Sequence, residues 1–256
     1  MTHDPFAPPT GPPAPARPTA PVAPSLAEPT AAGSAEPQYT YGTPLYTLPP
    51  LRSAAGLGVA AVVLACAWTA SQVLRLALAP GGAQALRDAE AAGLAALDSP
   101  LSGYDAVSLP SVLLMLAAYI VTCLWLSRSR STAVAANPPF IHERSPVWAW
   151  LGWWVPVVSF WFPYQVVRDV RRATAPGPVS GVGIGGWWAA WLVHLGASNL
   201  AGRLTASGAS GSAGQAADVL VPLEVVSTVA MVVALALWIR IVREITRAQE
   251  VRIAAA

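Results

Sequence analysis

The sequence predicts an all-α membrane protein with four transmembrane helices, one proline-broken aromatic segment that is re-entrant or interfacial, and a disordered N-terminal tail. Three observations predict this class. Only 11% of the 256 residues are charged and 54% are hydrophobic, whereas a soluble domain carries about 25% charged residues. Several charge-free runs reach about 20 residues, the length that crosses the roughly 30 Å hydrocarbon core of a bilayer. The first 50 residues hold 14 of the 25 prolines and cannot bury enough apolar surface to fold.

The change in composition near residue 50 divides the chain. Residues 1–50 are predicted to be a disordered, Pro/Ala-rich cytoplasmic tail, and residues 51–252 a multi-pass membrane domain. Within that domain the run 54–74 contains no charged residue. The first span is therefore predicted at about residues 53–79.

A polar stretch at residues 80–105 separates the first span from the second. It begins with Pro80-Gly81-Gly82. The stretch is acidic, and its middle contains good helix formers. We expect a loop outside the cell that holds one short surface helix.

Three further spans are predicted, at about residues 106–127, 183–203 and 219–240. The second of the four spans tolerates Pro110 because a proline in the first turns of a helix leaves few backbone groups unpaired. The third is rich in Gly, Ala and Ser, which allow helices to approach closely. A short loop at residues 203–217 is predicted between the last two spans.

The aromatic segment at residues 146–167 is long enough to cross the membrane, but its prolines do not suit a straight transmembrane helix. It contains no ionisable side chain except Tyr164. Pro156 and Pro163 each remove a backbone donor, so a straight helix through the segment is not expected. A re-entrant or bundle-buried segment is predicted. The alternative is a helix lying flat at the headgroup layer, which suits the many aromatic rings but needs a polar face that only Ser159 supplies.

The orientation follows from the bias of arginine toward the cytoplasmic side. If residues 146–167 do not cross, twelve of the 15 arginines lie on the cytoplasmic side and three lie outside. If the segment is a fifth span, the split becomes six inside and nine outside. The sequence therefore predicts a protein of the cell membrane with both termini in the cytoplasm. The twelve are Arg17, Arg52, Arg128, Arg130, Arg144, Arg168, Arg171, Arg172, Arg240, Arg243, Arg247 and Arg252.

Three features of the sequence together resemble a known family. They are the run WWVPVVSFWFPYQVVRDVRRA at residues 153–173, the pair Trp187-Trp188, and a last helix that ends IVREITRAQ. This pattern resembles the bacterial membrane family called domain of unknown function 4328, over roughly residues 51–250. The resemblance implies a multi-pass domain, frequently behind a Pro-rich tail, with no assigned chemistry.

The core motif of that family reads approximately W-x-P-x-x-N-x-x-x-P-Y. Trp154, Pro156, Pro163 and Tyr164 match it, and the resemblance implies a structural role for them. Ser159 stands where the pattern often has Asn. A role that needs a side-chain amide is therefore not expected at this position.

Polar residues inside the spans are the candidates for a site, because an ionisable group in lipid is costly and usually faces the bundle interior. Arg75, Asn199 and Glu224 lie at similar depth, four or five residues from the outer ends of their helices. They predict either a polar pocket that also includes His194, or a structural ion pair of Glu224 with Arg75 or Arg203. His194 could relay protons or only bond a hydroxyl of a neighbouring helix.

Two surfaces are candidates for contacts with partners beyond the bilayer itself. Arg168, Arg171 and Arg172 could hold anionic lipid headgroups, or could only mark the cytoplasmic end of the domain. The tail could bind a cytoplasmic protein. A net charge of +2 does not indicate nucleic-acid binding.

No catalytic, metal or cofactor site is predicted, because no paired carboxylates and no Ser/His/Asp or Cys/His set lie at matching depth. The sequence therefore favours a non-enzymatic membrane scaffold or interaction module. The alternative is a small-molecule or lipid binder or permease. A polar cavity bounded by His194, Asn199, Glu224 and the 156–163 backbone would favour transport, and a dry, packed bundle would favour scaffolding.

Overall fold

The computed structural model describes residues 49–94, 98, 101–174, 182–206 and 213–256, and within them it contains helices and no strand. All of them belong to one compact unit, Tyr46–Ala256. The predicted tail lies almost entirely outside the described residues. The helices are α1 (Ala55–Ala91), α2 (Gly103–Ala136), α3 (Trp148–Leu151), the 3-10 helix η2 (Val158–Phe160), α4 (Phe162–Thr174), α5 (Val182–Ala206) and α6 (Ala213–Ala254).

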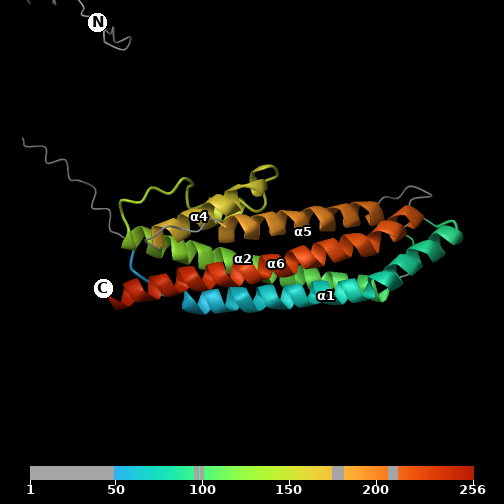
Figure 1. The fold of residues 1–256 in the computed structure, drawn as a ribbon, viewed down its shortest axis with the longest axis horizontal. Helices are drawn as coiled ribbons and strands as arrows, with labels where there is room; N and C mark the ends of the chain where they lie inside the picture. Colours follow the sequence, from blue (N-terminus) through green and yellow to red (C-terminus); the bar gives the residue numbers. More distant parts are fainter. Residues whose placement is uncertain (1–48, 95–97, 99–100, 175–181, 207–212) are drawn as a thin grey trace, which may run out of the picture. The chain divides into compact units, whose positions relative to one another are not determined.

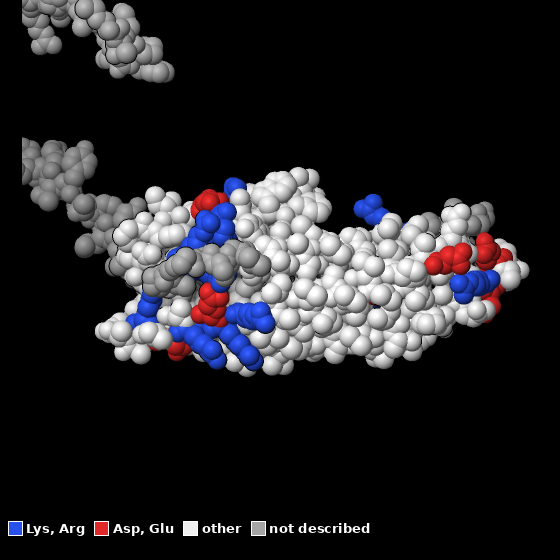
Figure 2. All heavy atoms as spheres, viewed as in Figure 1, with Lys and Arg blue, Asp and Glu red and all other residues white. Residues whose placement is uncertain are grey.

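Three of the described helices, α1, α2 and α6, are long and apolar enough to cross a membrane. The all-α class is confirmed, and these helices indicate a membrane protein. Figure 2 shows that charged side chains gather toward the two ends of the bundle on the visible face, with a wide uncharged band between them. α5 contains the predicted third span but is not among the three, because its tryptophans, His194 and Asn199 lower its mean hydropathy.

The long helices extend well beyond the spans predicted for them. α1 has 37 residues and α6 has 42, so at 1.5 Å per residue α6 is about 63 Å long. The loop predicted to begin at Pro80 is wrong over its first residues: α1 continues through Pro80 to Ala91 and bends near that end (Figure 1). A proline inside a helix costs one hydrogen bond and kinks it, and here the apolar residues after Pro80 pack against α6 and offset that cost.

The helix ends follow local sequence signals. Ser102 caps α2 through a capping box, in which its hydroxyl accepts from the Asp105 backbone N–H and the Asp105 carboxylate accepts from the Ser102 backbone N–H. Gly93 follows α1 with a φ of 71°, a conformation that glycine adopts at little cost. The loop predicted at residues 203–217 is partly helical, and its residues 207–212 lie outside the described residues.

The bundle has two separate cores, and α6 contributes to both. The first, which we call the alanine core, lies where the bent end of α1 meets the beginnings of α2 and α6. Its buried residues are Ala79, Ala83, Leu86, Tyr104, Ala201, Ala213, Ala216, Ala217 and Leu220. The second, which we call the aromatic core, is built on tryptophans and branched aliphatic residues. Its buried residues include Trp125, Leu126, Val166, Val167, Val170, Ile184, Trp187, Trp188, Trp238, Ile241, Val242 and Ile245.

The segment at residues 146–167 is broken in the structure. It contains the four-residue helix α3, η2 and the first turns of α4, joined by turns. The break falls after Pro156, where Val157 has a φ of 68°. Pro163 lies in the first turn of α4 and so begins a helix rather than breaking one. In Figure 1, α2 ends and α5 begins at the same end of the bundle, and α4 lies at that end too.

Candidate functional site

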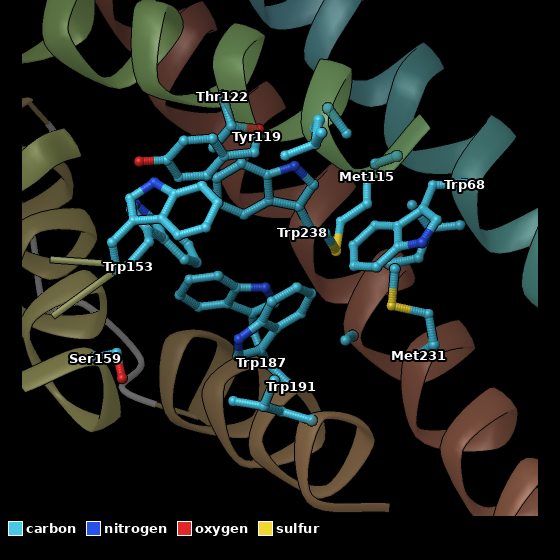
Figure 3. A pocket seen from close by; sticks show the side chains of 17 residues that line it. Trp68, Met115, Tyr119, Thr122, Trp153, Ser159, Trp187, Trp191, Met231 and Trp238 are labelled. Atoms are coloured by element: carbon cyan, nitrogen blue, oxygen red, sulfur yellow. The ribbon is translucent and has the colours of Figure 1, made fainter. Parts of the chain in front are cut away.

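A cavity of about 280 Å³ lies inside the aromatic half of the bundle. Figure 3 shows Trp153, Tyr119 and Trp238 on one side of it, Trp187 and Trp191 on the facing side, and Trp68 with Met231 at one end. Its wall is almost wholly apolar. The lining residues are Ala65, Trp68, Met115, Leu116, Ala118, Tyr119, Thr122, Trp153, Trp154, Ser159, Trp187, Trp191, Leu195, Met231, Ala234, Leu235 and Trp238.

Contacts between rings fix the shape of the wall. Trp187 stacks on Trp238 with ring centroids 5.2 Å apart, and Trp153 meets Trp191 edge to face at 6.1 Å. Tyr119 packs edge to face on Trp154 at 5.1 Å. Such pairs add about 0.5–1.5 kcal/mol each beyond their buried area. Bulky rings held in these orientations cannot collapse into the space between them, so the cavity persists.

The few polar groups of the wall come mostly from the broken segment. Nε1 of Trp153 is buried and has no hydrogen-bond partner among the described residues. Ser159 and Thr122 also line the cavity. The Tyr119 hydroxyl is already used, because it donates to the Trp150 carbonyl at 2.6 Å. The indole N–H of Trp153 is therefore a buried donor without a partner among the described residues.

Of the four residues that match the family motif, Trp154 lines this cavity. Trp154 lines the cavity and is still 58% exposed, so the cavity reaches the surface beside it. Pro156 precedes the break, and Ser159 lines the cavity from the far side of that break. Tyr164 packs against the aromatic core, with the Arg168 guanidinium carbon 5.8 Å from its ring centroid.

A buried polar cluster lies at the other end, next to the alanine core. Nη2 of Arg75 is 3.0 Å from Oε1 of Glu224, and the Tyr104 hydroxyl donates to the same carboxylate oxygen at 2.6 Å. The Arg75 guanidinium also donates to Tyr104 and, at 3.4 Å, to Gln72 Oε1. The Glu224 side chain is only 3% exposed. Its charge is therefore held inside the bundle by one cation and one hydroxyl.

The four predicted pocket residues are not gathered at one site. His194 belongs to a separate chain of bonds: its Nδ1 lies 2.9 Å from the Ser227 hydroxyl, which lies 2.8 Å from the Ser198 hydroxyl. The His194 ring contacts Trp68 and Trp191. Asn199 is exposed, and its amide donates to the Leu195 carbonyl of its own helix.

Tyr104 and most residues of the cavity wall were not predicted as site residues from the sequence. Tyr104 lies two residues before the predicted span 106–127, so the depth argument that grouped Arg75 with Glu224 could have included it. The cavity could not be predicted in this way. Aromatic rings from four helices line it, and whether they face one another depends on the rotation of each helix about its axis.

The three arginines considered for lipid headgroups differ in their contacts. Arg171 forms a two-point bridge to Glu244, with Nε to Oε1 at 2.9 Å and Nη2 to Oε2 at 2.8 Å. Arg168 is paired with Glu143 and with Asp169. Arg172 is exposed. Two of the three therefore already have carboxylate partners. In the described part of the chain, no three His, Cys, Asp or Glu side chains are placed to hold a metal ion.

Comparison with known proteins identifies a family. The model of the family described as Domain of unknown function (DUF4328) matches residues 102–247, which cover α2 to α6 except for the last residues of α6. The chain belongs to this family, as its motif indicated. No curated protein and no solved structure matches the chain.

Proposed function

We propose that this member of the family binds an amphipathic lipid molecule inside the membrane, in the tryptophan-lined cavity, and that it does so without catalysing a reaction. The observation that carries the proposal is the cavity itself, a space of about 280 Å³ with an apolar wall that the family motif helps to build. Non-helical backbone is tolerated at membrane depth where it lines a cavity. The broken segment around Val157 meets that condition.

The size and chemistry of the cavity support this class of ligand. A dry, apolar cavity of about 150 Å³ suffices to bind benzene, so the present cavity admits a larger apolar body. Thr122 and Ser159 line the cavity, and a hydroxyl of one of them would pair with one oxygen of the ligand. Ligand sites of this kind combine an apolar wall with a few placed polar groups. An acyl or isoprenoid chain that carries an ester, hydroxyl or carbonyl oxygen satisfies both requirements.

The proposal includes a membrane arrangement. We propose that α1, α2, α5 and α6 cross the membrane, that the broken segment returns to the cytoplasmic face, and that both termini are cytoplasmic. The common end at which α2 ends and α5 begins supports it (Figure 1). Reporter fusions at residues 137, 176, 210 and 256 test it, and we expect only the fusion at residue 210 to report from outside. Reporters at 137 and 176 on opposite sides of the membrane would contradict it.

The binding test fills the cavity from α6. Ala234 lines the cavity and is 2% exposed, whereas Ala236 lies two residues away on the exposed face of the same helix. The protein is purified, and the lipids that it retains are extracted and measured by mass spectrometry. We expect Ala234→Phe to lower the amount of retained amphipathic lipid at least tenfold, and Ala236→Phe to leave it unchanged.

A second measurement separates loss of binding from loss of folding. Both variants are delipidated and mixed with acyl chains that carry bromine, which quenches nearby tryptophan fluorescence, and circular dichroism reports their helical content. If wild type and a folded Ala234→Phe variant retain the same lipids and show equal quenching, the cavity does not bind lipid and the proposal fails.

A membrane scaffold is the second candidate function, and one observation favours it. Arg240, Arg243 and Arg247 are exposed and spaced along one side of α6, where they could contact an acidic partner. Substituting all three with Gln would remove co-purifying proteins if the scaffold function holds, without changing the lipid retained in the cavity.

A further inference from the structure

A second cluster of buried polar groups, distinct from the cavity, combines Arg130 of α2 with His142 of the segment between α2 and α3. Arg130 is 7% exposed, and its Nη1 atom is buried with no hydrogen-bond partner among the described residues. Both ring nitrogens of His142 are likewise buried and unpartnered within that part of the chain. An unpartnered buried polar group costs about 1–3 kcal/mol, so several in one place indicate that a partner normally satisfies them.

Hydrogen bonds to the backbone of Glu143 and Arg144 hold the segment next to His142 in place. The Arg130 guanidinium donates to the Arg144 carbonyl through Nη2. The Glu143 backbone N–H donates to Oδ2 of Asp169 at 2.8 Å. His142, which immediately precedes Glu143, packs its ring edge to face on Phe140 at 5.1 Å. The two groups with free nitrogens are thus held in place before any ligand arrives.

The charge balance of this cluster favours an anion. Asp169 pairs with Arg168, whose Nε and Nη2 donate to Oδ1 at 3.3 and 3.1 Å. Glu143 also pairs with Arg168. Arg130 and Arg144 make no ion pair with a carboxylate among the described residues, although Asp169 acts on Arg130 at longer range. Together with Arg168 these two arginines carry three positive charges against the two carboxylates, so the net charge of the cluster is +1. Burial, and then the charge of Arg130, lower the pKa of the His142 imidazole, whereas Asp169 opposes them; the ring therefore offers one N–H while it is neutral.

We infer that Arg130 and His142 form a binding site for a phosphate group at the cytoplasmic surface of the membrane. A guanidinium presents its N–H groups in a fork that suits phosphate oxygens, and the imidazole N–H supplies a second donor. Arg130 lies three residues beyond the predicted span 106–127, about 4–5 Å along the helix, which is near the phosphates of the lipid headgroups. This site is distinct from the one expected at Arg168, Arg171 and Arg172, and it does not depend on a ligand in the cavity.

The phosphate could belong to an anionic phospholipid or to a soluble phosphate, and two arms of one experiment distinguish these sources. In the first arm the purified protein is placed in nanodiscs of phosphatidylcholine with a minor fraction of phosphatidic acid, and the lipid bound after detergent extraction is measured. In the second arm thermal unfolding in detergent is recorded with inorganic phosphate or with chloride at equal ionic strength. The variants are Arg130→Gln, Arg130→Lys and His142→Phe. The matched control is Arg172→Gln, an exposed arginine of α4.

We expect wild type and Arg172→Gln to respond equally, and Arg130→Gln to weaken the response about tenfold, the loss typical of one charge-assisted hydrogen bond. Arg130→Lys should fall between them, because it keeps the charge and loses the fork. A response in the first arm alone identifies a lipid phosphate, and one in the second identifies a soluble phosphate. If His142→Phe and any folded Arg130 variant behave as wild type in both arms, or if wild type responds in neither, the inference is overturned. Should Arg130→Gln fail to fold, His142→Phe and Arg130→Lys decide the matter.

Discussion

The aromatic core and the alanine core solve the packing of one helix, α6, in opposite ways. In the aromatic core large rings meet edge to face and leave a cavity of about 280 Å³ between them. In the alanine core small side chains bring the helices close, and a Cβ added at Gly82 would lie 3.1 Å from Cβ of Tyr104. The empty volume between the helices of this bundle is therefore set by the volume of the side chains. Large rigid rings preserve a void, and alanines remove it.

The two regions also treat charge differently. The Arg75–Glu224 pair lies next to the alanine core and is hydrogen-bonded to Tyr104 of that core. The residues that line the cavity of the aromatic core include no charged one. A buried ion pair is costly to break because one charge is left without its partner. Close packing around Glu224 therefore stabilises a specific arrangement of α1, α2 and α6, while the cavity wall leaves room for an uncharged guest.

The largest expected effect comes from breaking the Arg75–Glu224 ion pair next to the alanine core. Arg75→Leu leaves the buried Glu224 carboxylate with only the Tyr104 hydroxyl, and we expect it to lower the free energy of unfolding by about 3–5 kcal/mol. Thermal unfolding in detergent measures this change. Arg203→Leu, at an exposed arginine of α5, is the control and should change stability little. The double variant Arg75→Leu/Glu224→Leu should recover much of the loss, and an additive loss instead would contradict the coupling.

The second prediction tests the difference in free space. Ala83 and Ala234 are each 2% exposed, but only Ala234 lines the cavity. Ala83→Leu should destabilise the protein by about 1–3 kcal/mol because the alanine core has no room for the added atoms. Ala234→Leu should leave the free energy of unfolding unchanged or raise it by about 0.5–2 kcal/mol because it fills space. Equal losses, measured by denaturant unfolding, would show that the two cores are equally tight.

A smaller effect is expected at neighbouring glycines near the bend of α1. A Cβ at Gly82 would meet Tyr104 and Leu220, whereas a Cβ at Gly81 would meet nothing within 4 Å. Gly81→Ala should stabilise the helix by about 0.5–1 kcal/mol through the lower backbone entropy of alanine. Gly82→Ala should lose that gain or reverse it. Unfolding midpoints of the two variants measure the difference, and identical midpoints would mean that Tyr104 moves aside without cost.

The smallest expected effect is at His142, in the segment between α2 and α3, and depends on pH. The pKa of His142 is lowered by burial and by Arg130 of α2, with Asp169 of α4 acting in the opposite direction. The unfolded chain therefore takes up the proton first, so stability is complete above about pH 6.5, the ordinary histidine pKa, and falls as the pH drops below it. Unfolding of wild type and His142→Phe between pH 5 and 8 measures this, and only wild type should show the decline.

Several elements could be predicted from the sequence, and each has a local cause. Charge-free runs of about 20 residues predicted α1 and α2, and an apolar run interrupted by Glu224 predicted α6. The family motif predicted the family. Pro156 predicted the break because a proline acts on its own turn. The Pro80 prediction failed because the packing of Ala83 and Leu86 against α6, which no local signal reports, outweighs the lost hydrogen bond.

The sequence by itself determined the helical class, the membrane character and the break after Pro156, because all three follow from composition and from the covalent geometry of neighbouring residues. Only the tertiary structure decided that Glu224 pairs with Arg75, that Asn199 is exposed, and that rings from several helices enclose a cavity. The physical reason is that these features depend on the rotation of each helix about its axis. That rotation is set by contacts between residues far apart in the chain.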